Sequence, residues 1–146
     1  MADERRLLAE VRECFDQQLM LCDLLEAIAD SLPDRLNHEN CRRAAALVGP
    51  LLRLAHEAEE TLLFPRILAA HAQGRAVIEQ LRLEHLEDEC FGEEVQFELN
   101  QLGCRQPVLA PETTSYMLRG FFECLRARVR HERELLDKLP LAIAVN

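Results

Sequence analysis

Apolar residues recur three and four positions apart in four long segments of this chain. Residues with this spacing lie on one face of an α-helix, so the pattern predicts four amphipathic helices. The helices are expected over residues 3–31, 40–72, 74–102 and about 113–139. No segment alternates apolar and polar residues over the length of a strand, and no β-strand is expected.

Glycine and proline residues mark the expected helix ends. Pro33 interrupts the first pattern, Gly103 breaks the third, and Pro140 follows the fourth. The Gly49-Pro50 pair lies inside the second helix and is expected to kink or split it. The candidate N-caps are Asn37 or Asn40 for the second helix and Thr113 or Thr114 for the fourth.

Chain length and apolar content favour one compact domain. The chain has 146 residues, of which 49% are hydrophobic, enough to build a core without disulfide bonds. Four helices with short connections pack most simply as a bundle. The sequence therefore predicts an all-α, up-down-up-down four-helix bundle spanning residues 1–146.

Charge and cysteine spacing limit the kinds of partner and the cell compartment that the sequence favours. The formal net charge of −9, from 26 acidic and 17 basic residues, argues against nucleic acid or an anionic membrane as the main partner. No apolar run is long enough to span a membrane, and the first residues do not resemble a signal peptide. The six cysteines show no C-x-x-C pair and are expected to be reduced thiols. A cytoplasmic protein is expected.

Histidine stands among carboxylates in three of the four predicted helices. The pairs are His56 with Glu60, His85 with Glu89, and His131 with Glu134. Residues three or four apart share a helix face, so each pair can offer an imidazole and a carboxylate to one ion. Such ligands suit divalent iron, manganese or zinc. The alternative interpretation is that the glutamates form a solvated face and the histidines lie at its boundary.

The order of these motifs resembles the hemerythrin-like HHE cation-binding family. The similarity rests on His56-x-x-x-Glu60 followed by Leu62-Leu63-Phe64-Pro65, on Leu83-Glu84-His85, and on His131-Glu132 before Leu139-Pro140. It covers nearly the whole chain. The resemblance implies a four-helix bundle around a di-iron centre, with His56, Glu60, His85 and His131 as ligands and glutamates bridging the metals.

The chain departs from the family pattern in two helices. The first predicted helix contains no histidine, and Gln17 or Gln18 stands where the resemblance implies a ligand. In the fourth helix Leu135 and Leu136 stand where the family has a carboxylate, which leaves Glu134 as the best-placed substitute. One ion, two ions with altered carboxylates, or no ion remain open.

The resemblance implies a metal-binding protein rather than an enzyme. We expect mononuclear or dinuclear non-haem iron, or another divalent metal, that binds or senses oxygen or nitric oxide, or an iron-handling role. The alternative is a degenerate, metal-poor bundle that acts as a regulatory interaction module. In that case a homodimer or another protein would be the partner instead of a small diatomic ligand.

Overall fold

The structure is a computed structural model that describes residues 2–140, apart from the side chains of residues 2, 3 and 7. Residue 1 and residues 141–146 of the predicted domain lie outside this description. The elements are α1 (Ala2–Ser31), α2 (His38–Ala58), the π-helical segment η1 (Glu59–Leu63), α3 (Phe64–Ala70), α4 (Gly74–Gly103) and α5 (Pro111–Lys138). No strand occurs within residues 2–140, which confirms the predicted all-α class.

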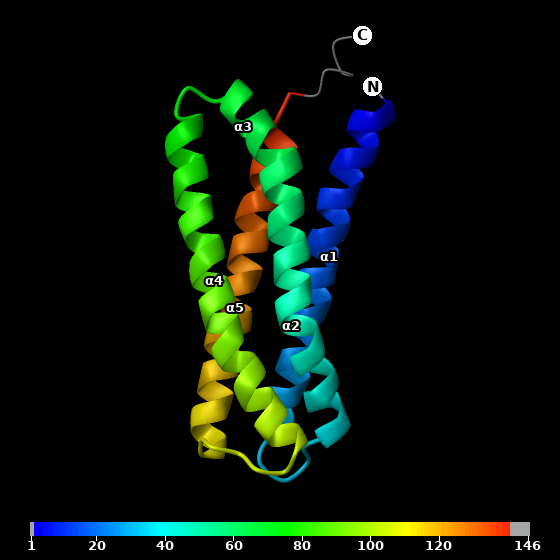
Figure 1. Ribbon diagram of the computed structural model, residues 1–146, viewed down its shortest axis with the longest axis vertical. Helices are drawn as coiled ribbons and strands as arrows, with labels where there is room; N and C mark the ends of the chain where they lie inside the picture. The colour runs from blue at the N-terminus through cyan, green and yellow to red at the C-terminus, as the bar shows by residue number, and fades with distance from the viewer. Residues whose placement is uncertain (1, 141–146) are drawn as a thin grey trace.

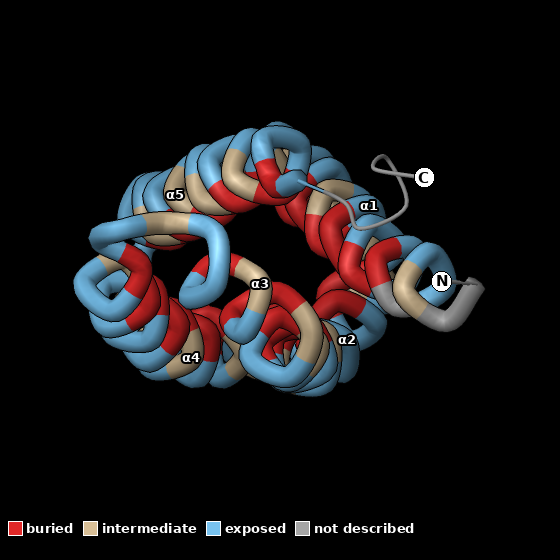
Figure 2. The backbone as a smooth tube through the Cα atoms, turned by 90° about the horizontal axis from the view of Figure 1, so that it is seen from above, coloured by how far each residue is buried: buried red, intermediate tan, exposed pale blue. Residues whose placement is uncertain are grey.

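The helices surround one shared core (Figure 1). Helix α1 packs against α2 and α5, α2 packs against α4, and α4 also contacts α5. Seen from the end, the buried residues line the inside of this ring and the exposed residues cover its outside (Figure 2). No helix within the described part of the chain has the length and apolar character needed to cross a membrane.

The predicted second helix is continuous but irregular. Helical backbone runs from α2 through η1 into α3, and Gly49-Pro50 does not split it. The irregular turn lies further on, in η1, where the Phe64 N–H donates to the carbonyl of Glu59 five residues earlier. Pro65 follows directly and has no N–H to donate. Single π-turns of this kind occur often at functional sites, which draws attention to residues 59–63.

One of the two predicted caps is correct. The Asn37 side chain accepts a hydrogen bond of 3.0 Å from the Asn40 N–H and caps α2. Helix α5 instead starts at Pro111, whose fixed φ suits the first helical position. Thr114 is buried within α5 and donates to Glu98 Oε1 at 3.4 Å, so the predicted threonine cap is wrong.

A layer of buried polar residues divides the core. One apolar cluster includes Leu52 and Val95, and the other includes Leu63 and Leu81. Between the two clusters α1, α2, η1, α4 and α5 each contribute at least one buried polar side chain. These residues are Gln18, His56, Glu59, His85, Asp88 and Glu132. Burying polar groups in this way costs free energy unless they are paired. The buried polar layer is therefore the candidate functional site.

The buried face of α5 differs from the predicted one by one residue. The resemblance implied His131 as a ligand facing the core, whereas His131 is exposed. The buried residues of α5 are Thr114, Leu118, Phe121, Phe122, Leu125, Val129, Glu132 and Leu136. One residue corresponds to a rotation of about 100°, which moves Glu132 inward in place of His131. The larger set of apolar side chains decides this orientation.

Candidate metal centre

His56 lies buried on α2, one turn before the π segment, and is held by the neighbouring helix. Its Nδ1 lies 2.9 Å from Glu89 Oε2 on α4. In the neutral imidazole, the Nδ1–H donates to the carboxylate and the lone pair stays on Nε2. A carboxylate that orients histidine in this way is the usual second partner of a metal-binding imidazole.

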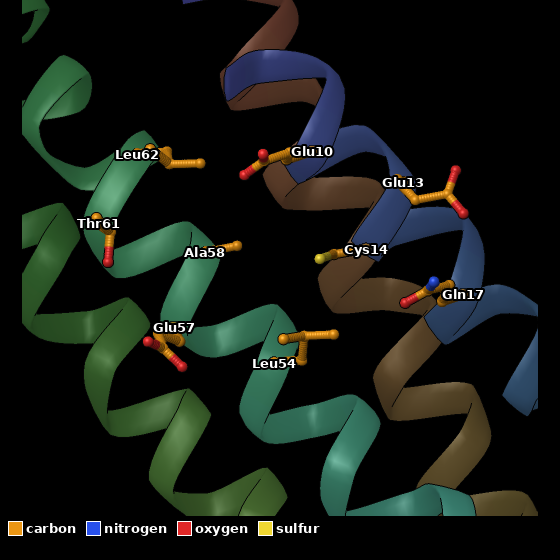
Figure 3. A pocket seen from close by; sticks show the side chains of 9 residues that line it. All are labelled: Glu10, Glu13, Cys14, Gln17, Leu54, Glu57, Ala58, Thr61 and Leu62. Atoms are coloured by element: carbon orange, nitrogen blue, oxygen red, sulfur yellow. The ribbon is translucent and has the colours of Figure 1, made fainter. Parts of the chain in front are cut away.

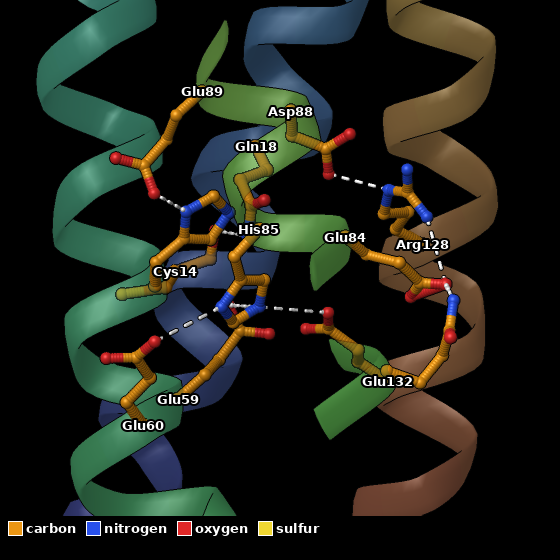
Figure 4. A network of polar contacts seen from close by, with 12 residues as sticks. Cys14, Gln18, Glu59, Glu60, Glu84, His85, Asp88, Glu89, Arg128 and Glu132 are labelled. Atoms are coloured by element: carbon orange, nitrogen blue, oxygen red, sulfur yellow. Dashed lines mark hydrogen bonds and ion pairs between the residues drawn. The ribbon is translucent and has the colours of Figure 1, made fainter. Parts of the chain in front are cut away.

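His85 on α4 lies at the centre of the polar layer. Its ring stacks on that of His56, with centroids 3.9 Å apart and planes within 8°, and on Phe64 at 5.6 Å. His85 Nε2 lies 3.4 Å from Glu132 Oε1 on α5 and 3.6 Å from Glu59 Oε2 on η1 (Figure 4). Four helical elements, α2, η1, α4 and α5, therefore bring two imidazoles and two carboxylates together.

Several atoms of this cluster are buried without a hydrogen bond. They are Nδ1 and Nε2 of His85 and Oε1 of Glu59. Leaving such an atom unsatisfied costs about 1–3 kcal/mol. His56, Glu59 and His85 also offer ligand atoms that all lie within 4.8 Å of one another. A divalent cation among them would accept the lone pair of one His85 nitrogen and a lone pair of Glu59, and so remove those penalties, while the other His85 nitrogen carries the ring proton.

Burial sets the charge of the cluster. Burial, with the nearby His56, Arg128 and Arg82, lowers the pKa of His85 to about 3, so its imidazole is neutral at pH 7. Burial alone raises the pKa of Glu132 to about 8, so this carboxyl group is neutral at pH 7 in the metal-free protein. Both shifts reflect the cost of charge in a dry layer. A bound cation would stabilise ionised Glu132 in its place.

A guanidinium group borders the cluster on its α5 side. Arg128 Nε lies 2.7 Å from Asp88 Oδ2, and its Nη1 lies 3.1 Å from Glu84 Oε2. Nη2 lies 3.4 Å from Glu87 Oε2. Arg128 and Glu132 are one turn apart on α5, so this helix presents one cation and one carboxyl group to α4. The arginine had no role in the sequence prediction.

Helix α1 contributes an amide. Gln18 is buried, and its Nε2 donates at 3.2 Å to the carbonyl of Cys14 on the same helix. Gln17 is only partly buried and lines a surface pocket beside α2. Of the two glutamines left open by the sequence, Gln18 is the one that faces the polar layer.

The predicted pairs within one helix are replaced by pairs between helices. Glu89 contacts His56 on α2 and was expected to act together with His85. Glu60 reaches the rim of the cluster, where its Oε1 lies 3.8 Å from His85 Nδ1 and its side chain is 46% exposed. Glu59, the preceding residue, is the buried one and takes the inner position.

The structure does not bring the predicted fourth-helix residues into the cluster. His131 and Glu134 are both exposed on α5, because the helix turns Glu132 inward. The signal for Glu132 was present in the sequence. It is the one carboxylate in the apolar series Leu125, Val129, Leu136.

The donor set fits one divalent cation. Two imidazoles and two carboxylates supply four ligands, and mixed nitrogen and oxygen ligands suit iron, manganese or zinc. Arg128 pairs with two further carboxylates beside the cluster, Glu84 and Asp88.

Comparison with known families gives one match that spans most of the chain. The hemerythrin family, described as the Hemerythrin HHE cation binding domain, matches residues 5–139. No curated protein and no solved structure matches the chain. The match and the cluster agree on cation binding as the property to explain.

Proposed function

The chain belongs to the hemerythrin HHE cation-binding family, and we propose on that basis that it binds a single non-haem iron ion in the polar layer. The observation that carries the proposal is the buried cluster of His56, Glu59 and His85, whose ligand atoms lie within 4.8 Å of one another. Glu132 completes the set from α5. The proposal takes the bundle to be of the up-down-up-down type.

Each residue of the cluster has a distinct task. His56 is oriented by Glu89, which fixes the proton on Nδ1 and leaves Nε2 to bind. Glu59 and Glu132 supply the negative charge that balances a divalent cation. Phe64 stacks on His85 and excludes water from that part of the layer.

An iron ion held by these residues would supply an open coordination position for a small diatomic molecule such as oxygen or nitric oxide. A surface pocket of about 440 Å³ lies between α1 and the segment α2–η1, and its lining residues Gln17 and Ala58 directly precede Gln18 and Glu59 of the layer (Figure 3). Leu54, Ala58 and Leu62 supply the apolar part of its lining, Glu10, Glu13 and Glu57 supply carboxylates, and Cys14 points into it. Such a lining favours the passage of an uncharged diatomic molecule over that of an anion.

We propose reversible binding or sensing rather than catalysis. The residues of the layer are held by stacking, by burial and by the His56–Glu89 hydrogen bond. The neutral state of His85 at pH 7 suits a ligand, whereas a general base needs a pKa near the working pH. Iron transfer to another molecule would use the same cluster.

Metal content of matched variants tests the proposal. Purified protein reconstituted with ferrous iron without oxygen should retain about one iron per chain after desalting. Glu59→Gln and His85→Gln should each lower this content at least tenfold, because each removes a buried ligand. His131→Ala, which alters an exposed histidine on α5, should bind as the unchanged protein does. Circular dichroism checks that every variant keeps its helices.

Two results would overturn the proposal. Equal iron content in the Glu59→Gln and unchanged proteins would exclude the buried cluster as the site. No retained iron in any protein would favour the alternative function, a metal-poor bundle that regulates a protein partner. A loss of iron in His131→Ala alone would move the site to the exposed face of α5.

A further inference from the structure

The polar layer reaches solvent where α2 and η1 lie against α4, a line we call the α2–α4 seam. Two partly exposed carboxylates stand at this seam: the side chain of Glu60 is 46% exposed and that of Glu89 is 39% exposed. Each lies beside a buried imidazole. Glu60 Oε1 is 3.8 Å from His85 Nδ1, and Glu89 Oε2 is 2.9 Å from His56 Nδ1 (Figure 4). Negative charge therefore extends from the surface to both histidines of the cluster.

The α5 side of the layer is unfavourable for an approaching cation. The carboxyl group that contacts His85 from α5, that of Glu132, has a side chain only 5% exposed. One turn earlier on α5 stands the guanidinium of Arg128, 2.7 Å from Asp88 and 3.1 Å from Glu84. Its positive charge repels an approaching cation, and the carboxylates around it are already paired.

Neutral and apolar side chains border the layer elsewhere. Toward α1 lies the buried amide of Gln18, and burial raises the pKa of the neighbouring Cys14, so its thiol is uncharged at pH 7. The carboxylates of the surface pocket on that side pair with no histidine of the described cluster. Along the bundle, the apolar clusters that include Leu52 and Leu63 flank the layer. A cation that enters such surroundings loses its hydration without compensation.

His85 has an unpaired nitrogen on the side of the α2–α4 seam. Its Nδ1 is buried and has no hydrogen-bond partner, and the 3.8 Å to Glu60 Oε1 is too long for a hydrogen bond. The space between these atoms suits a cation, since metal–nitrogen and metal–oxygen bonds are each about 2.1 Å long. The other ring nitrogen, Nε2, lies 3.6 Å from Glu59 Oε2. Consecutive residues of η1 thus place one exposed and one buried carboxylate at the two nitrogens of the same ring.

We propose that Glu60 is the entry ligand of the centre, which binds the incoming divalent cation at the α2–α4 seam and passes it to Glu59 and His85. The inference rests on the proposed function, in which the ion finally binds His56, Glu59, His85 and Glu132. As the ion moves from Nδ1 to Nε2 of His85, the ring proton exchanges through water from Nε2 to Nδ1, so the imidazole keeps one proton throughout. Glu60 holds the ion in passage and not in the final complex. Its loss therefore slows uptake and release by the same factor and leaves the dissociation constant unchanged.

The experiment measures the rates of iron uptake and release. Protein is mixed with ferrous iron without oxygen, uptake is stopped at set times with excess chelator, and iron per chain is measured after desalting. Release is measured by transfer of bound iron to the same chelator. Glu60→Gln should slow both rates about tenfold, because a local carboxylate raises the cation concentration at the entrance. The final content should stay at about one iron per chain, as proposed above.

Two matched variants serve as controls. Glu60→Asp keeps the negative charge at the seam and should take up iron nearly as fast as the unchanged protein. Glu57→Gln removes the same charge from an exposed residue of α2 that lines the pocket beside α1. It should leave both rates unchanged, because that pocket is not the route of the cation.

The results distinguish the two proposals. Equal uptake rates in Glu60→Gln and the unchanged protein would overturn the entry role of Glu60 and leave the proposed centre intact. A final iron content lowered in Glu60→Gln as far as in Glu59→Gln would also overturn it, because Glu60 would then be a ligand of the bound ion. An equal slowing in Glu57→Gln would assign the effect to overall charge and overturn the seam as the route. No retained iron in the unchanged protein would overturn both proposals.

Discussion

Substitution of Glu132 by glutamine is expected to stabilise the metal-free protein while it weakens metal binding. The carboxyl group of Glu132 is 4% exposed, and burial raises its pKa from 4.5 to about 8. The nearby His85 is neutral at pH 7, so it provides no charge to offset an ionised Glu132. Glutamine has almost the same shape and carries no charge at any pH.

The size of the effect follows from proton binding to the folded and unfolded chains. Between pH 4.5 and pH 8 the unfolded chain loses the Glu132 proton and the folded protein keeps it. The unfolded state binds fewer protons in this range, so the free energy of unfolding falls as the pH rises. Between these pH values the free energy of unfolding falls by about 1.4 kcal/mol per pH unit. The decrease is about 3 kcal/mol at pH 7 and levels off at about 5 kcal/mol above pH 8.

Urea unfolding followed by circular dichroism in chelator-containing buffer measures this difference. The free energies of Glu132→Gln and the unchanged protein should lie close together near pH 4.5 and separate up to pH 8, with the variant more stable. Glu134→Gln, an exposed position two residues further along α5, should follow the unchanged protein at every pH. Parallel pH profiles for Glu132→Gln and the unchanged protein would refute the neutral, buried carboxyl group.

Three further substitutions or reactions test the packing. Gly92→Ala should lower the free energy of unfolding by about 1 kcal/mol in urea titrations, because the new Cβ would lie 2.8 Å from Leu52 Cδ1. Gly120→Ala, whose Cβ would meet no atom closer than 3.9 Å, should raise it by a similar amount through better helix propensity. Native protein treated with a thiol reagent should react at the exposed Cys90 and leave Cys22 unlabelled, because burial raises the pKa of Cys22 to about 12. Mass spectrometry of peptides measures the labelling, and early labelling of Cys22 would contradict this expectation.

The sequence predicted those features that depend on spacing along one helix. The apolar repeats predicted the four helical segments, and His56 and His85 lie on the buried faces where their apolar neighbours placed them. Glu59 lies three residues after His56, about one helical turn along the same segment, so it also belongs to the features that spacing predicts. The choice between Glu59 and Glu60 was not settled by spacing, because both positions lie near the face of His56.

The remaining site features depend on contacts between helices. The His56–Glu89 hydrogen bond joins residues 33 positions apart, and no pattern within one helix encodes it. The inward face of α5 could not be predicted from its motif because His131 and Glu132 are adjacent, and only the packing of the whole helix selects Glu132. The π-turn likewise follows from packing around residues 59–63, since its residues have no distinctive local composition.

The most direct test of the central claim is an anomalous difference map at the iron absorption edge, from crystals of protein reconstituted with ferrous iron. One strong peak per chain is expected among His56, Glu59, His85 and Glu132, with no second peak in the polar layer. A peak beside the exposed His131, two peaks in the polar layer, or no peak at all in iron-loaded crystals would contradict it.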